Sequence, residues 1–449
     1  MVKMKSSLQS SNLCTATYNN RLSNCSSICR LIKWPLFLGK FLKTFLIYAV
    51  KNFMDWLKLD INTVGYGFSD LEVKHSCARP IGPGFESCST RSFGITRSLI
   101  HAFDPHGKHY TPTIKPTTGF SASADAERLH RAMKGAGTDE TAIINILARR
   151  TNYERQELCR SYKSLYKHDL KDDLKSETIG DFRKVLCQLV VDTPYMLAKS
   201  LYYAMKGLGT NDRVLIEIFT TLWNDETRAV ADAYKQVLKD KGIEESERSL
   251  VTDMKKEISG DYEYALMCLV QAERDEIPVL QLKAIPEKGI NSIINHELAE
   301  ADAKDLYASG VGRVGTSEKR ITRVICNRTP YQLYLTSEIY FKMYGKTLLE
   351  HIESETSGDY RKLLVAILRY AIDRPGLIAE WLHDSMAGLG TKDYALMRLL
   401  ITRSEIDLQD IMNSYESIYG KSLLNAVIDD TSGDYRRTLC VLLGETYNQ

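Results

Sequence analysis

Apolar residues recur at three- and four-residue spacing through most of residues 118–446, which is the pattern of amphipathic helices. At the start of this region the spacing predicts helices over residues 125–134, 139–150, 154–166, 169–175 and 181–191. In the second of these, Ile143, Ile144, Leu147 and Ala148 form one apolar stripe. The region has no stretch with the alternation and turn signals of β-strands. The hydrophobic pattern therefore predicts an all-α fold.

Four glycine–threonine pairs in this region are each followed by a distant acidic residue. The pairs are Gly137-Thr138 with Glu177, Gly209-Thr210 with Glu257, Gly315-Thr316 with Glu355, and Gly390-Thr391 with Asp430. The glycine and the acid are 40 residues apart in three copies and 48 apart in the copy that ends at Glu257. A fixed separation of matched residues indicates a repeated structural unit. We predict four units of about five helices each, and we expect each threonine to cap the helix that follows it.

The second unit and its connection to the third depart from the regular pattern. Unit two has eight extra residues around Asp240–Arg248, between two predicted helices. The connector that follows is long, is broken by Pro278 and Pro286, and includes a predicted helix over Asn291–Leu306. The expected boundaries are 1–117 for an N-terminal extension, 118–191 for repeat 1, 192–274 for repeat 2, 275–292 for the connector, 293–371 for repeat 3 and 372–446 for repeat 4.

Charge and cysteine content separate the extension from the repeats. Residues 1–110 have a net charge of +8, whereas the remainder has a net charge of −6. Such a split predicts two parts that behave differently. The ten cysteines form no CxxC pair, which favours reduced thiols in a cytosolic protein over disulfides. The first twenty residues lack an apolar run, so we expect no conventional signal peptide.

The glycine turns and the distant acids together have the chemistry of a calcium site. The last carbonyl groups of a helix have no partner within it, and glycines that adopt positive φ let successive carbonyls point inward. A carboxylate from 40 residues away adds negative charge to these neutral oxygens. Calcium takes six to eight oxygen ligands in flexible geometry. The alternative is that the glycines merely end helices, but several copies with matched acids favour calcium.

The residue between the two glycines of the turn is apolar in three copies, as Ala136, Leu208 and Leu389. Single apolar residues on a surface usually have no special role. Three at equivalent loop positions suggest contact with a membrane.

With the loops, acids and repeat number considered together, the chain resembles an annexin over about residues 118–446. Lys134-Gly135-Ala136-Gly137-Thr138 and Lys206-Gly207-Leu208-Gly209-Thr210 match the family's loop. The resemblance implies a curved disc of four five-helix repeats with Ca²⁺ as cofactor. It also implies reversible, calcium-dependent binding to acidic phospholipid, with peripheral localisation on membranes. We expect no enzymatic activity, because the chain shows no nucleophile–base pattern. The long connector resembles that of flatworm annexins.

The resemblance also implies the ligands in each repeat. They are Met133, Gly135, Gly137 and Glu177 in repeat 1; Met205, Gly207, Gly209 and Glu257 in repeat 2; Gly310, Arg313, Gly315 and Glu355 in repeat 3; and Met386, Gly388, Gly390 and Asp430 in repeat 4. Ala136, Leu208, Val314 and Leu389 would contact the membrane. In repeat 2 the insertion lies between the loop and its acid, shortly before Glu257.

The extension leaves three interpretations open. Lys33, Lys40, Lys51 and Lys58 lie on one side of an otherwise apolar stretch over residues 31–59, which predicts an amphipathic helix on a membrane surface. The other interpretations are a membrane span and a segment with no folded role. Residues 60–117 contain five prolines and predict a loose linker. The family's tails differ in their partners, so a tail-binding protein and self-association on membranes remain open.

Two other functions compete with calcium-dependent membrane binding. One is a constitutive membrane-associated scaffold that residues 31–59 hold in place. The other is an enzyme, but we find no nucleophile–base pattern. Gly310-Val-Gly-Arg-Val-Gly315 fits a dinucleotide-binding pattern, yet it follows a predicted helix and not a strand. Basic residues in the repeats are balanced by acids, so nucleic acid is not indicated.

Overall fold

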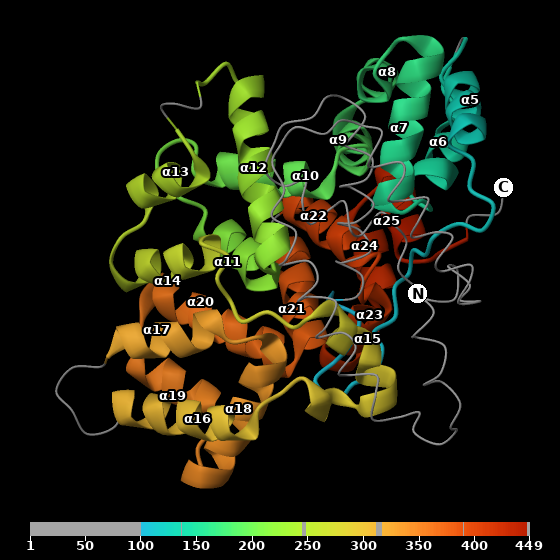
Figure 1. The fold of residues 1–449 in the computed structure, drawn as a ribbon. Helices are drawn as coiled ribbons and strands as arrows, with labels where there is room; N and C mark the ends of the chain where they lie inside the picture. The colour runs from blue at the N-terminus through green and yellow to red at the C-terminus, as the bar shows by residue number, and fades with distance from the viewer. Residues whose placement is uncertain (1–99, 136, 245–247, 311–316, 389, 447–449) are drawn as a thin grey trace, which may run out of the picture. The chain divides into compact units, whose positions relative to one another are not determined.

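The computed structural model describes residues 100–446 except 136, 245–247, 311–316 and 389, and all structural statements below concern these described residues. They form α-helices, together with one isolated antiparallel bridge between Phe103 and His109. The predicted all-α fold is confirmed (Figure 1). The amphipathic helix expected over 31–59 lies outside the described residues.

Twenty of the described α-helices fall into four sets of five, while α15 (Val279–Lys288) and the short 3₁₀ helix η2 (Ile290–Ser292) lie in the connector between repeats 2 and 3. Repeat 1 contains α5 (Ala122–Ala132), α6 (Glu140–Leu147), α7 (Asn152–Tyr166), α8 (Leu170–Glu177) and α9 (Gly180–Leu189). Repeat 2 contains α10 (Thr193–Ala204), α11 (Asp212–Thr221), α12 (Asn224–Asp240), α13 (Leu250–Glu257) and α14 (Gly260–Val270). Repeat 3 contains α16 (His296–Gly310), α17 (Glu318–Asn327), α18 (Pro330–Tyr344), α19 (Leu348–Glu355) and α20 (Gly358–Ile372). Repeat 4 contains α21 (Arg374–Met386), α22 (Asp393–Arg403), α23 (Leu408–Tyr419), α24 (Leu423–Asp430) and α25 (Gly433–Leu442).

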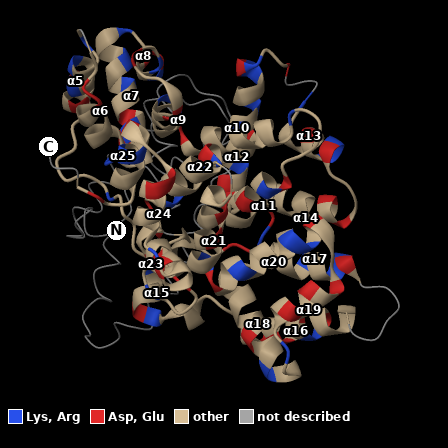
Figure 2. Cartoon of the chain, turned by 180° about the vertical axis from the view of Figure 1, so that it is seen from behind, with Lys and Arg blue, Asp and Glu red and all other residues tan. Residues whose placement is uncertain are grey.

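Each repeat is organised around the same helix pair. The first helix packs on the third, as α5 on α7, α10 on α12, α16 on α18 and α21 on α23. The stripe expected between residues 139 and 150 is buried, since Ile143, Ile144 and Leu147 are at most 2% exposed. Burying apolar area in this way is the main stabilising term of such a unit. Lys, Arg, Asp and Glu are interspersed over the outer helix faces (Figure 2).

The repeats associate in pairs through their second and fifth helices. Repeat 1 contacts repeat 4 through α9 on α22 and α6 on α25. Repeat 2 contacts repeat 3 in the same way, through α11 on α20 and α14 on α17. The two pairs of repeats therefore have equivalent interfaces, and each interface brings together the N-terminal ends of four helices.

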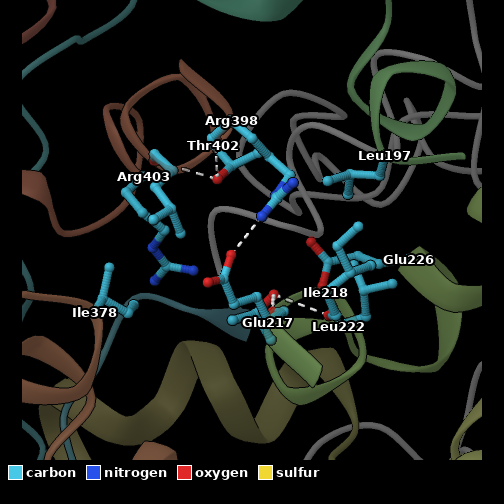
Figure 3. Close-up of a pocket in the computed structure, with 11 residues that line it drawn as sticks. Leu197, Glu217, Ile218, Leu222, Glu226, Ile378, Arg398, Thr402 and Arg403 are labelled. Atoms are coloured by element: carbon cyan, nitrogen blue, oxygen red, sulfur yellow. Dashed lines mark hydrogen bonds and ion pairs between the residues drawn. The ribbon is translucent and has the colours of Figure 1, made fainter. Parts of the chain in front are cut away.

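A buried ion pair joins repeats 2 and 4. Arg398 of α22 pairs with Glu217 of α11, and both side chains are nearly inaccessible (Figure 3). Arg213 also donates to Glu217, over 2.6 Å. The cavity beside this pair holds only about 20 Å³, which is room for about one water molecule. We therefore regard this polar centre as structural and look for the functional site elsewhere.

The part of the extension that the structure describes packs against several repeats. His101 is 1% exposed; its Nε2 lies 3.0 Å from Glu226 of α12 and its Nδ1 lies 3.2 Å from the Tyr370 hydroxyl of α20. Further along, the Thr113 hydroxyl donates to the Leu442 carbonyl over 2.7 Å, and the Thr117 amide donates to Glu154 over 2.7 Å. The loose linker expected over 60–117 is thus wrong for residues 100–117, because proline content does not reveal these long-range partners.

The connector between repeats 2 and 3 holds a helix in an unexpected place. Helix α15 spans Val279–Lys288, begins after Pro278 and contains Pro286 near its end. The helix expected over 291–306 is instead α16, the first helix of repeat 3, which begins at His296. Pro286 lies in the last turn of α15, so the hydrogen bond that its missing amide removes is one of the last in the helix.

Candidate calcium-binding loops

The glycine turns connect the first and second helices of repeats 1, 2 and 4. In each turn both glycines have positive φ: 113° and 96° at Gly135 and Gly137, 122° and 85° at Gly207 and Gly209, and 102° and 85° at Gly388 and Gly390. A side chain added at any of the six would meet no atom within 4 Å. The glycines are therefore required by backbone conformation and not by lack of space.

A backbone hydrogen bond closes each turn. The Asp139 amide donates to the Ala132 carbonyl over 2.8 Å, the Asn211 amide to Ala204 over 2.8 Å and the Lys392 amide to Ser385 over 2.7 Å. Inside the turns of repeats 1 and 2, no described residue donates a hydrogen bond to the carbonyl groups of Gly135, Gly137, Gly207 or Gly209. Carbonyl oxygens that are left without a donor in an exposed turn suit a hard cation.

The distant acids reach the turns in the same three repeats. Glu177, Glu257 and Asp430 are the last residues of α8, α13 and α24. The Thr138 hydroxyl lies 3.4 Å from a Glu177 carboxylate oxygen. The corresponding distances are 3.0 Å from Thr210 to Glu257 and 2.6 Å from Thr391 to Asp430. The structure thus brings together the glycine turns and the acids that the sequence pairs across 40 or 48 residues.

The threonines have a different role from the expected one. The N-cap residues of α6, α11, α17 and α22 are Asp139, Asn211, Ser317 and Lys392, one position after each threonine. The expectation that the threonines cap these helices is therefore wrong for Thr138, Thr210 and Thr391, and Thr316 lies outside the described residues. Their hydroxyls hold the acids instead, a role that helix-capping preferences cannot reveal because it depends on a partner far along the chain.

The eight extra residues of repeat 2 leave its site geometry intact. Glu257 still meets Thr210, and Arg248 at the end of the insertion donates hydrogen bonds of 2.7, 2.8 and 3.0 Å to Asp253. This ion pair lies at the start of α13, four residues before Glu257. Arg248 is therefore fixed to the helix that presents the acid, and the pairing in repeat 2 resembles the others.

Repeat 3 is described only in part. Gly310 ends α16, and a side chain there would lie 2.4 Å from the His351 ring and 2.9 Å from the Glu355 Cγ atom. Gly310 is thus required by close packing and lies beside Glu355, the predicted acid. Arg313, Val314 and Gly315 lie outside the described residues. Burial lowers the pKa of His351, which is 1% exposed.

Two exposed apolar side chains lie near these turns. Leu208 is fully exposed between its two glycines, whereas Ala136 and Leu389 lie outside the described residues. Ile179, two residues after Glu177, is 78% exposed. Ile179 is not among the predicted membrane contacts, although the other repeats have Ser259, Ser357 and Ser432 at its position. A comparison of the four copies would have identified it.

Known proteins resemble this chain along its four repeats. The family model described as Annexin matches residues 124–189, 196–269, 301–367 and 378–442. The chain belongs to the annexin family. This family is known for calcium-dependent phospholipid binding. The four matched segments fall within the four repeats of this annexin.

Individual relatives cover most of the annexin core. Annexin B22 of Schistosoma mansoni is 91% identical over 357 residues, which is 80% of this chain and 98% of that protein. Annexin A3 of Mus musculus is 40% identical and covers 74% of this chain and 96% of its own length. A crystal structure of calcium-bound annexin (Sm)1 is 89% identical, with a TM-score of 0.77 over 79% of this chain and 99% of its own. Schistosoma is a flatworm, so this relative fits the resemblance of the connector to that of flatworm annexins.

Proposed function

We propose that this annexin binds acidic phospholipid membranes in response to calcium, through the glycine turns of its repeats. The observation that carries the proposal is the approach of Glu177, Glu257 and Asp430 to the turns of their own repeats. Calcium would join the turn oxygens to a lipid phosphate. The proposed ligands are the carbonyls of Met133, Gly135 and Gly137 with Glu177, and their counterparts in the other repeats, as the sequence predicts.

The number of oxygens in each turn explains why lipid and calcium should bind together. Three carbonyls and one carboxylate supply fewer oxygens than the six to eight that calcium prefers. Because the lipid supplies the rest, lipid raises the affinity for calcium and calcium raises the affinity for lipid by the same factor. Several turns on one molecule add their effects through effective concentration.

Leu208 and Ile179 are proposed to enter the lipid surface. Both side chains are exposed beside a turn or its acid, and an apolar side chain that leaves water gains about 1.5–3 kcal/mol on full burial. Ala136, Val314 and Leu389 remain proposed contacts at equivalent positions in the other repeats.

Co-sedimentation with vesicles tests the proposal against a constitutive scaffold held by the extension. Calcium-dependent binding predicts that the full chain pellets with acidic vesicles in calcium and stays in solution with EGTA. Removal of residues 1–60 should leave that dependence unchanged. Pelleting that ignores EGTA, and that disappears with residues 1–60, would support the scaffold instead. In the described residues, no helix is long and apolar enough to cross a membrane.

We also propose that the chain acts by binding and not by catalysis. Among the thiols of the described residues, burial raises the pKa of Cys159 and of Cys326 to about 12 in each case. A thiol with a raised pKa is a poor nucleophile because the thiolate is the reactive form. The expected site of action is peripheral, on the cytoplasmic face of membranes.

A further inference from the structure

The two equivalent interfaces between repeats differ in their basic residues. In repeats 1, 3 and 4 the fifth helix has two consecutive basic residues, three and four positions after its first glycine: Arg183-Lys184, Arg361-Lys362 and Arg436-Arg437. In repeat 2 these positions hold Glu263 and Tyr264. Helix α14 of repeat 2 therefore lacks two cations that the other repeats have, and it has one additional acid.

These basic residues have defined contacts where they are present. Arg183, Arg361 and Arg436 donate to the carbonyls of Thr178, Thr356 and Thr431, just after each predicted calcium-binding acid. Arg437 crosses the interface between repeats 4 and 1, where it bonds Asp434 over 2.7 Å and the Thr141 hydroxyl over 2.6 Å.

At the interface between repeats 2 and 3, no basic residue takes the place of Arg437. Asp261 corresponds to Asp434, and it forms no ion pair with any described residue. Lys319, at the position of Thr141, is exposed and lies outside the wall of the cavity described next. Tyr264 is 40% exposed and supplies no charge.

An acidic cavity of about 420 Å³ lies at this interface. Its wall includes six carboxylates, from Asp212, Glu257, Asp261, Glu318, Glu355 and Asp359. Figure 2 shows the acidic segments of α14, α17 and α19 in this region. The N-termini of α11, α14, α17 and α20 each supply about half a positive charge, and Lys362 pairs with Asp359 over 2.9 Å. Together they supply about three positive charges. Five carboxylates remain when Glu355, which has a further interaction, is left out, so the cavity remains acidic.

A buried hydroxyl group also faces this cavity. Tyr262 lines it with a side chain that is 9% exposed, and no described residue meets its hydroxyl with hydrogen-bond geometry, although Asp212 lies beside it. Burial, and next the charge of Asp359, raise the pKa of Asp212. The carboxylates therefore repel one another, and a polar atom in the wall lacks a partner.

We propose that the acidic cavity between repeats 2 and 3 binds an arginine side chain of a basic partner protein, which takes the place that Arg437 fills at the other interface. A guanidinium group offers five N–H donors in a planar fork and can bridge carboxylates that are some distance apart. A single metal ion fits less well, because no three His, Cys, Asp or Glu residues in the described part of the chain are close enough to share one. The cavity volume lies in the range of small-ligand sites.

Calcium should weaken the binding of this partner, and this consequence rests on the proposed function. Glu257 and Glu355 belong both to the cavity wall and to the predicted calcium sites of repeats 2 and 3. Calcium on these two acids would replace negative charge by positive charge, and the arginine would then be bound less tightly. The partner is therefore expected in the calcium-free state and is released when calcium arrives.

The test measures binding of a short fluorescent oligo-arginine peptide to the full-length protein by anisotropy, in EGTA. We expect binding to the wild type. The double variant Glu263→Arg with Tyr264→Arg copies Arg436-Arg437 into repeat 2. It should lower the affinity for the peptide at least about tenfold. Asp212→Asn should lower the affinity for the peptide to a similar extent. This single variant tests the proposal even if the double variant does not fold. Asp393→Asn is the matched control, because Asp393 lies beside Tyr435 at the other interface as Asp212 lies beside Tyr262.

The proposal would be overturned if Asp212→Asn and Asp393→Asn lost peptide affinity equally. It would also be overturned if the double variant folded and bound the peptide as tightly as the wild type. Displacement of the peptide by phosphatidylserine and phosphatidylethanolamine vesicles in EGTA would also overturn it, in favour of a lipid ammonium group. If the peptide binds but calcium fails to release it, the cavity stands and the roles of Glu257 and Glu355 in calcium binding are wrong. That result separates failure of the inference from failure of the proposed function.

Discussion

The Thr391 hydroxyl donates a hydrogen bond of 2.6 Å to the Asp430 carboxylate, although the two residues are 39 positions apart. It also lies 3.2 Å from the Asp430 carbonyl. The threonine therefore contacts both the side chain and the backbone carbonyl of Asp430, which we propose as the charged ligand of repeat 4. A carboxylate that is already positioned loses less freedom when an ion arrives, which favours binding.

Asp430→Asn should raise the calcium concentration needed for vesicle binding, because the amide has no negative charge to offer the ion. We expect a change on the order of tenfold for this one turn of several. The matched control is Asp429→Asn, the neighbouring acid, which pairs with Lys421 over 2.6 Å on the exposed side of α24. Co-sedimentation across a calcium series measures both. Equal effects of the two variants, or unfolding of Asp430→Asn, would show that the carboxylate is not a specific ligand.

Gly209→Ala should disable the turn of repeat 2. Gly209 has φ of 85° in open space, and a side chain in the left-handed region costs roughly 1–2 kcal/mol. Gly242→Ala is the control, since Gly242 has φ of 70° in open space but lies outside the turn. Both variants should lower the melting temperature by similar amounts. Only Gly209→Ala should weaken calcium binding in a lipid-free titration, and a similar loss in Gly242→Ala would contradict this role for the turn.

Leu208→Ser should weaken vesicle binding without changing calcium binding in the absence of lipid. The side chain is fully exposed, so its removal costs little in the free protein, whereas its transfer into lipid would be lost. Leu165→Ser is the comparison, because Leu165 is 47% exposed on α7. Vesicle titration at a fixed calcium concentration should separate them. If both variants bind vesicles like the wild type, Leu208 does not enter the membrane.

His101 should make the fold less stable in mild acid. Burial is the largest cause that lowers the pKa of His101 below its usual 6.5, and the charge of Glu226 opposes this only in part. The unfolded chain therefore takes up a proton that the folded chain resists, so stability is lost as the pH falls from 6.5 towards the lowered pKa. Urea unfolding across this range measures the slope. His101→Gln should have a smaller slope, and an unchanged one would assign the effect to another group.

Much of this fold could be predicted from the sequence because its determinants are local or repeated. The stripe of Ile143, Ile144 and Leu147 specifies a helix through its spacing alone. The pairing of Gly390 with Asp430 was predictable because similar pairs recur along the chain. The extra helix α15 and the packing of His101 against Glu226 could not be predicted in this way, since neither feature is repeated and His101 has partners more than a hundred residues away.

The sequence by itself determined the helical repeats, their number and the residues of each proposed site, because helical periodicity and glycine's access to positive φ act over a few residues. Only the tertiary structure decided what Thr391 does, since its hydroxyl could cap a helix or hold Asp430, and packing selects the second. Packing also decided where charge remains uncompensated. Glu263 and Tyr264 are ordinary surface residues in the sequence, and their position at the interface of repeats 2 and 3 leaves an acidic cavity there.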